Sequence, residues 1–136
     1  MKIAFDENIP NALVKAFQLF SNERAFKNIT GDYKIQSALD YTPKLHDKDY
    51  LPKNDVPWIK RFSDSDGRVI ITGDTAMSVK PHERLALIEA GMIVIFFEPK
   101  WNKWKFFDKC ALLMHWWPIL AYKVKFAEKG LSGKFR

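Results

Sequence analysis

The chain has 136 residues, of which 47% are hydrophobic and 28% charged, so it can form one globular domain with one core. The net charge of +6 and the pI near 9.4 favour an anionic partner such as RNA, DNA, a membrane surface or an acidic protein. A single cysteine, Cys110, excludes an internal disulfide and fits a reducing cytoplasm. No apolar run approaches about 18 residues, and a charge follows the first residue, so we expect neither a membrane helix nor a signal peptide.

Strands and helices alternate along the hydrophobic pattern. The first half of the chain predicts a strand over 2–5, a helix over about 10–20 that Asn8 can cap, a strand over 26–30, a short helix over 35–39 and a long polar loop over 41–54. The second half predicts a helix over 55–63, a strand over 68–72, a helix over about 81–90, a strand over 92–97, a helical face over 106–117 and a further helix over 119–129.

This alternation predicts an α/β fold. Since successive parallel strands need helical crossovers, we expect a three-layer α/β/α sandwich around a mainly parallel sheet of about four strands. Residues 1–129 would form this single domain, and residues 130–136 would form a loose basic tail.

Three carboxylates should meet at the carboxyl edge of this sheet. Asp6 follows the first strand, and Asp74 follows the apolar strand at 69–72, which Gly73 ends. Asp55 lies at the start of a crossover helix, whose amino end lies at the same edge because crossover helices run antiparallel to the strands. In open α/β sheets this edge is where ligands bind.

Clustered carboxylates repel one another, and their pKa values rise unless a cation neutralises them. An all-oxygen set suits Mg²⁺ or Mn²⁺, which can orient an attacking water and neutralise charge on a scissile phosphate. Each acid also has a structural explanation: Asp55 as an N-cap, Asp6 and Glu7 as favourable charges before the first helix, and Asp74 as a turn residue. The convergence of all three at one edge favours the metal site.

In this order and spacing, these residues resemble the PIN domain, and most closely the compact PIN-like group with its VapC-type toxins. The resemblance rests on Phe5-Asp6-Glu7-Asn8-Ile9-Pro10, Asn54-Asp55-Val56-Pro57-Trp58-Ile59, Gly67-Arg68-Val69-Ile70-Ile71-Thr72-Gly73-Asp74, Lys80-Pro81-His82-Glu83 and Trp117-Pro118-Ile119. It spans nearly the whole chain apart from residues 21–53. The resemblance implies a ribonuclease in which Asp6, Asp55 and Asp74 ligate the metal, with RNA as substrate and with a cognate antitoxin and a second copy of the chain as partners.

The sequence departs from the family pattern at one point. Typical PIN domains carry another acidic residue on a helix between the first and third positions. The candidates in that region, none of them in a recognisable motif, are Asp32, Asp40, Asp47 and Asp49. Asp40 is the choice among them, and without such an acid a two-metal mechanism lacks a ligand.

Several other side chains are candidates for substrate binding. We expect Arg68 and Lys80 to hold phosphates near the acidic edge, because Lys80 precedes a helix amino end, which favours anions. Glu7, Asn8 and Thr72 lie beside the predicted ligands and complete the expected contacts. The turn over 101–105 mixes tryptophan with lysine, a pattern typical of surfaces that bind single-stranded nucleic acid by stacking and charge.

Three functions fit these features. The first is a Mg²⁺- or Mn²⁺-dependent endoribonuclease, the toxin of a toxin–antitoxin pair. The second is a non-catalytic module that binds RNA or a protein partner and keeps the fold with a degraded acidic site. The third, a small phosphatase or receiver-like domain, fits less well because the first strand ends in Asp6-Glu7-Asn8, without the Asp-x-Asp pair of haloacid-type phosphatases.

Overall fold

The computed structural model describes residues 2–73, 80–97, 99–126 and 132–135. The elements, in chain order, are β1 (Lys2–Phe5), α1 (Asn11–Ser21), α2 (Arg24–Thr30), β2 (Lys34–Ser37), the 3-10 helix η1 (Ala38–Asp40), α3 (Val56–Asp64), β3 (Gly67–Thr72), α4 (Pro81–Glu89), β4 (Ile93–Phe97), the 3-10 helix η3 (Pro99–Lys103), α5 (Phe106–Phe126) and β5 (Ser132–Phe135).

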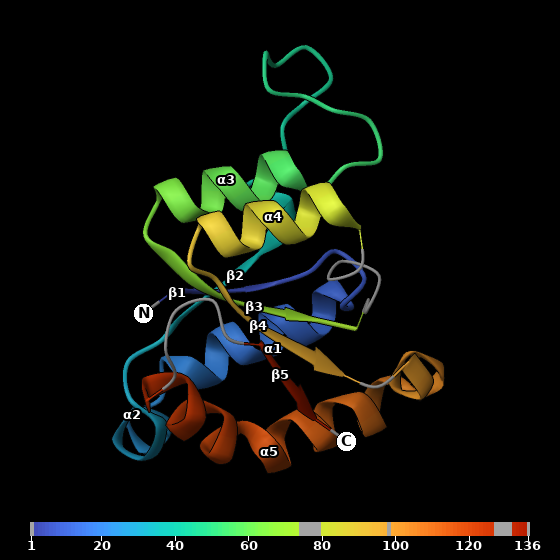
Figure 1. Cartoon of the computed structure of the whole chain (residues 1–136). Coiled ribbons are helices and arrows are strands. Elements are labelled where there is room, and N and C mark those ends of the chain that lie inside the picture. The colour runs from blue at the N-terminus through green and yellow to red at the C-terminus, as the bar shows by residue number, and fades with distance from the viewer. Residues whose placement is uncertain (1, 74–79, 98, 127–131, 136) are drawn as a thin grey trace.

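The predicted three-layer sandwich with a parallel sheet is confirmed. The described residues form a five-stranded sheet in the order β2-β1-β3-β4-β5, and every neighbouring pair is parallel. Helices α3 and α4 cover one face, and α1, α2 and α5 cover the other (Figure 1). All carboxyl ends of the strands therefore lie at one edge. Within the described residues, no helix is both long and apolar enough to cross a membrane.

Strand β3 is buried on both faces, as its continuous apolar run predicts. Val69 and Ile71 belong to the core beneath α1 and α5, whereas Ile70 belongs to the core beneath α3 and α4. Since alternate residues of a strand point to opposite faces, only an unbroken apolar run can serve both cores. Burial in both cores holds β3 in place, and with it the position at the acidic edge where the chain leaves the sheet.

Two predictions between residues 26 and 39 were wrong. Residues 26–30 are helical, as part of α2, and Phe26 packs against Trp117 with a ring-centroid distance of 6.0 Å. The segment 35–39 is not a helix, because 34–37 form β2, which pairs with β1 and places Ile35 in the core. This strand is short and lies at the sheet edge, so it carries little apolar signal. The predicted loop after it is confirmed, and it projects from the body (Figure 1).

The C-terminal predictions also need correction. Helix α5 runs continuously through Pro118, although proline removes a hydrogen bond and normally breaks a helix. The buried stripe of Leu113, Trp117 and Leu120 continues across it, and burial of that stripe offsets the lost bond. Where a loose tail was expected, residues 132–135 form β5, which pairs in parallel with β4.

Replacing Gly67 by Ala is expected to destabilise the fold by about 1–3 kcal/mol, the usual cost of overpacking a core. An added Cβ at this position would lie 2.5 Å from the ring of Phe62, which is fully buried on α3. Urea unfolding of the variant measures the loss. Adding Phe62→Leu should make the double variant less unstable than the sum of the two single changes; simple additivity would contradict this steric explanation.

Candidate functional site

Asp6 is a buried carboxylate at the carboxyl edge of the sheet. Only 3% of its surface is exposed, and its main-chain N–H donates to the carbonyl of Ile71 at 2.9 Å, which continues the β1–β3 pairing. The hydroxyl of Thr72 donates to Asp6 Oδ2 at 2.8 Å, and the N–H of Glu7 donates to Oδ1 at 2.8 Å. The carboxylate is thus held in one orientation by two strands, and Thr72 contacts it as a hydrogen-bond donor.

Burial raises the pKa of Asp6 from 3.8 to about 6, despite the two hydrogen bonds, which lower it. The negative charge of Asp55 raises this pKa further. An ionised carboxylate here at neutral pH therefore costs stability, and a bound cation would remove that cost.

Asp55 is at the N-cap position of α3, yet its side chain does not cap the helix. The side chain of Asn54 accepts from the N–H of Val56 at 2.9 Å in its place. Asp55 Oδ1 accepts from the indole N–H of Trp58 at 3.0 Å. Capping alone does not explain this carboxylate, whose negative charge acts on both Asp6 and Glu83.

Glu83 is the acid that the sequence predictions missed. Its side chain is 1% exposed, and its Oε2 accepts from the main-chain N–H of Asp55 at 3.1 Å. Its Oε1 is buried with no hydrogen-bond partner among the described residues, and Lys80 Nζ lies 3.9 Å away. Burial raises the pKa of Glu83; the hydrogen bond from the N–H of Asp55 lowers this pKa in part, and the negative charge of the Asp55 side chain raises it. The amino end of a crossover helix lies at the carboxyl edge of the sheet, which is how Asp55 was placed there. Glu83 lies in the first turn of α4, the crossover helix after β3, so the same argument identifies it.

Asp74 lies outside the described residues, which resume at Lys80. Strand β3 ends at Thr72, the residue that contacts Asp6, so the chain leaves β3 beside that carboxylate. In the part of the chain that the structure describes, no group of three or more His, Cys, Asp or Glu side chains is placed to hold a metal ion. The predicted ligand set of Asp6, Asp55 and Asp74 remains a prediction.

The residues predicted to contact the substrate do not all lie at the acidic edge. Glu7 and Asn8 are exposed directly after Asp6, and Lys80 precedes α4 at the same edge. The expectation for Arg68 was wrong: it lies near the amino end of β3, four residues before Thr72, hence roughly 13 Å from the acidic edge at 3.3 Å per residue. The direction of the strand, readable in the sequence, already placed it there.

The acids considered for a fourth position have other roles. Asp40 accepts from the N–H of Ser37 at 3.1 Å and so forms a capping box at η1. Asp47 and Asp49 bind Arg61, which donates to Asp49 at 2.6 and 2.7 Å and anchors the projecting loop to α3. The hydrogen bond from Arg61 lowers the pKa of Asp49. Asp32 precedes β2 and lies at the opposite edge of the sheet.

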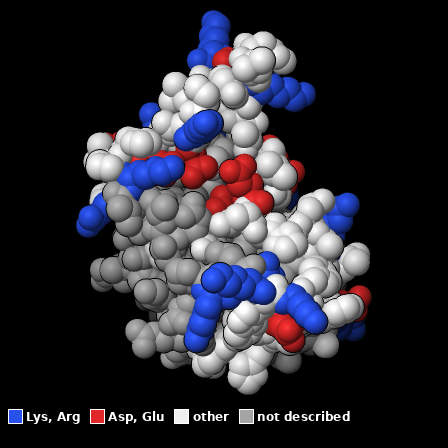
Figure 2. Space-filling model, turned by 90° about the vertical axis from the view of Figure 1, so that its right-hand side faces the viewer, with Lys and Arg blue, Asp and Glu red and all other residues white. Residues whose placement is uncertain are grey.

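Figure 2 views the molecule onto the carboxyl edge of the sheet. Acidic side chains gather near the middle of this face, with lysine or arginine above and below them. Such an alternation of charge suits a polyanion that crosses an acidic centre, because the flanking cations bind phosphates while the centre repels them unless a metal ion is bound.

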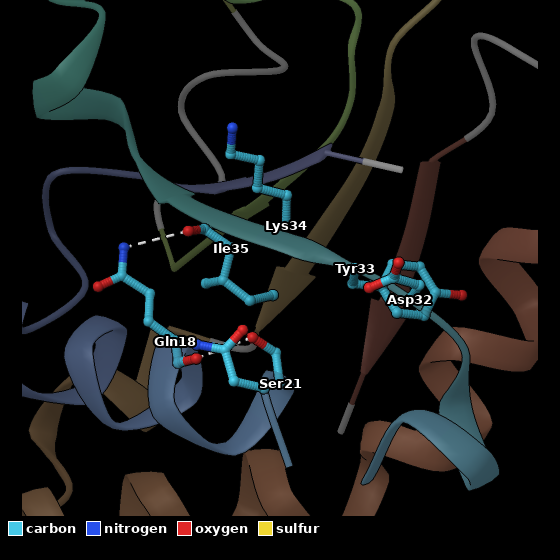
Figure 3. A pocket seen from close by; sticks show the side chains of 7 residues that line it. Gln18, Ser21, Asp32, Tyr33, Lys34 and Ile35 are labelled. Carbon is cyan, nitrogen blue, oxygen red and sulfur yellow. Dashed lines mark hydrogen bonds between the residues drawn. The ribbon is translucent and has the colours of Figure 1, made fainter. Parts of the chain in front are cut away.

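A pocket of about 450 Å³ lies elsewhere, between the C-terminal end of α1 and the amino end of β2 (Figure 3). Its lining is mostly polar, and Gln18 donates to the carbonyl of Ile35 at 3.1 Å, which satisfies one main-chain acceptor of β2. The amino ends of parallel strands lie opposite the edge that carries Asp6. This pocket therefore lies apart from the acidic edge.

These features define the class as a parallel α/β domain with buried carboxylates at the carboxyl edge. The family model described as PIN like domain matches residues 1–99, and the chain belongs to this family. PIN-like domains are generally nucleases and commonly use divalent metal ions. No curated protein and no solved structure matches the chain.

The stability of the metal-free protein should depend on Asp6 and on pH. Between about pH 4 and 6 the folded state binds the Asp6 proton more tightly than the unfolded state, so the free energy of unfolding falls as the pH rises. Above pH 6 the cost is about 3 kcal/mol, from two pKa units at 1.4 kcal/mol each. With EDTA present, Asp6→Asn should be more stable than wild type by up to this amount at pH 7.5, and the gap should close near pH 4.

Urea unfolding at the two pH values measures this gap. The matched control is Asp64→Asn, an exposed acid at the end of α3. A constant difference between wild type and Asp6→Asn across this range would show that the Asp6 carboxylate is not strained by its burial.

Proposed function

We propose that the protein is a metal-dependent endoribonuclease that hydrolyses RNA phosphodiester bonds, and that it acts as the toxin of a toxin–antitoxin pair. The observation that carries the proposal is the buried Asp6, fixed by Thr72 and electrostatically coupled to Asp55, in a PIN-like domain. Asp6, Asp55 and Asp74 would hold Mg²⁺ or Mn²⁺, and RNA, a cognate antitoxin and a second copy of the chain are the proposed partners.

The donor set fits such an ion. Its described members are carboxylates, the ligands that Mg²⁺ and Mn²⁺ prefer, and Glu83 places a further buried carboxylate beside Asp55, with Oε1 3.9 Å from Lys80 Nζ. When bound, the ion would lower the pKa of a coordinated water and neutralise charge on the scissile phosphate.

The protein side chains would supply orientation. Thr72 and the N–H of Glu7 hold the Asp6 carboxylate, while Trp58 holds one oxygen of Asp55. Because these contacts exist before any ligand binds, the site would lose little entropy on binding. Lys80, partly exposed beside Glu83, would bind an RNA phosphate next to the scissile bond.

The test is cleavage of single-stranded RNA by the wild-type protein with Mg²⁺ or Mn²⁺, with EDTA, and by Asp74→Asn. We expect cleavage only in the first case. Equal cleavage by wild type and Asp74→Asn would indicate a contaminating nuclease. The alternative function, a non-catalytic RNA-binding module, would be supported by RNA binding without cleavage under every condition, and it is favoured if the described acids bind no ion.

A further inference from the structure

An open groove at the start of α5 combines a tryptophan ring with lysines, and Phe107 directly precedes its lining residue Asp108. It has a volume of about 640 Å³ and is lined by Lys103, Trp104, Lys105, Asp108, Ala111 and Leu112. Lys103 and Lys105 are exposed and form no ion pair with a described residue. Two of the lining residues are therefore cations with no ion-pair partner in the described part of the chain, and one is an acid.

The aromatic side chains here are exposed although the neighbouring tryptophan is buried. Trp101 is 2% exposed and stacks on Phe97 at a centroid distance of 4.5 Å, and Lys109 lies 5.1 Å over its ring. By contrast, Trp104 is 40% exposed and Phe107 82%. Trp101 anchors the turn to the core, and beside it Trp104 and Phe107, whose ring contacts that of Phe106 at 5.6 Å, present exposed ring surface. Exposed apolar groups gathered in this way mark an interaction site.

This groove shares a face with the acidic edge. It follows β4, which is separated from β1 by β3 alone, so the end of β4 lies roughly 10 Å from Asp6 at two strand spacings. On the face seen in Figure 2, lysine or arginine side chains gather below the acidic group, at the level where Figure 1 shows the start of α5. A bound chain could extend from the groove to Asp6 without crossing the sheet.

We propose that this groove binds a single strand of nucleic acid, with bases stacked on Trp104 in the groove and on the adjacent exposed Phe107, and with phosphates bound by Lys103 and Lys105. Aromatic rings next to cations match the alternating bases and phosphates of such a strand, whereas duplex bases are not free to stack. The same groove on a second copy of the chain would fit less well, because the lysines of the two copies would repel one another. The idea that the bound nucleic acid continues to Asp6 rests on the proposed function. Binding in the groove is independent of that function.

The experiment measures binding without catalysis. A fluorescently labelled single-stranded RNA is titrated with the full chain in EDTA, and the anisotropy gives Kd at several salt concentrations. Trp104→Ala and Phe107→Ala should each weaken binding about fivefold to a hundredfold. The double variant Lys103→Ala/Lys105→Ala should also reduce the slope of log K against log salt by roughly 1.4, from 0.7 per phosphate contact on a single strand.

The controls are matched in charge and exposure. Lys15→Ala/Lys60→Ala removes two exposed lysines from α1 and α3, and Tyr122→Ala removes an exposed ring from the far part of α5. All variants should retain the wild-type circular dichroism spectrum. Weakening by the groove variants but not by the controls supports the proposal.

Equal weakening by groove variants and controls, or undiminished binding by the groove variants, would overturn it. A dimer that dissociates on Trp104→Ala, with RNA affinity unchanged, would instead assign the groove to self-association. The proposed function fails separately: RNA bound in the groove but uncut with Mn²⁺ would refute the nuclease and leave this site standing.

Discussion

Asp6→Asn is expected to abolish RNA cleavage, by about a thousandfold or more, while the metal-free protein becomes more stable. The thousandfold loss corresponds to about 4 kcal/mol of transition-state stabilisation, a size that loss of a metal ion can account for. The gain in stability arises because the variant removes a carboxylate whose pKa burial raises to about 6. A residue that acted only in folding would not lower activity and raise stability together.

Asparagine suits this position, because its amide oxygen can accept from the N–H of Glu7 and its amide nitrogen can donate to the Thr72 hydroxyl. The measurements are initial rates of RNA cleavage with Mn²⁺ and thermal melts in EDTA, with Asp64→Asn as the control. We expect a rise of several degrees in Tm for Asp6→Asn. Cleavage at the wild-type rate would remove Asp6 from the catalytic site.

Glu83→Gln is expected to weaken Mn²⁺ binding and cleavage by about tenfold to a hundredfold, the usual effect of changing a group that supports a metal ligand. The glutamine oxygen still accepts from the N–H of Asp55, so the start of α3 should keep its position. What the variant removes is the negative charge beside Asp55, including the buried Oε1 that has no hydrogen-bond partner among the described residues.

Two comparisons make this prediction specific. Glu83→Ala also removes the acceptor, and leaving the N–H of Asp55 unpaired should cost a further 1–3 kcal/mol, roughly, of folding stability. Glu89→Gln changes an exposed acid at the end of the same helix and should have no effect. If Glu83→Gln binds Mn²⁺ like the wild type and Glu83→Ala does not, Glu83 acts only through its hydrogen bond to Asp55.

The sequence predicts best those elements that are buried on both sides. Strands β3 and β4 are continuous apolar runs because each serves two cores, and their short length and many β-branched residues favour a strand over a buried helix. Strand β2 is hard to predict because it lies at the edge of the sheet and its first residue, Lys34, is exposed. Its pairing with β1 stabilises it, and the local sequence gives no sign of that pairing. The prediction at Pro118 fails for a similar reason, since the side chains that bury its neighbour Trp117 come from α1, α2 and β1, which are distant in the sequence.

In the candidate site, too, some positions follow from the sequence and others only from the fold. The positions of Asp6 after β1 and Asp55 at the start of α3 follow from strand direction and helix crossover, and the structure places both there. Since the amino end of a crossover helix lies at the carboxyl edge of the sheet, Glu83 in the first turn of α4 is expected at that edge too. Strand direction likewise places Arg68, near the amino end of β3, at the opposite edge. The hydrogen bond between Thr72 and Asp6 depends on the pairing of β1 with β3, which only the fold establishes.

The most direct test of the acidic edge is a calorimetric titration of Mn²⁺ into the wild-type protein and into Asp74→Asn, with thermal melts of the same samples. The site proposed here predicts saturable binding to the wild type and a Tm that rises with Mn²⁺ concentration, since an ion that binds only the folded state stabilises it. Asp74→Asn should show neither. No heat and no rise in Tm at millimolar Mn²⁺, with RNA still bound, would contradict the metal site and leave a non-catalytic RNA-binding module.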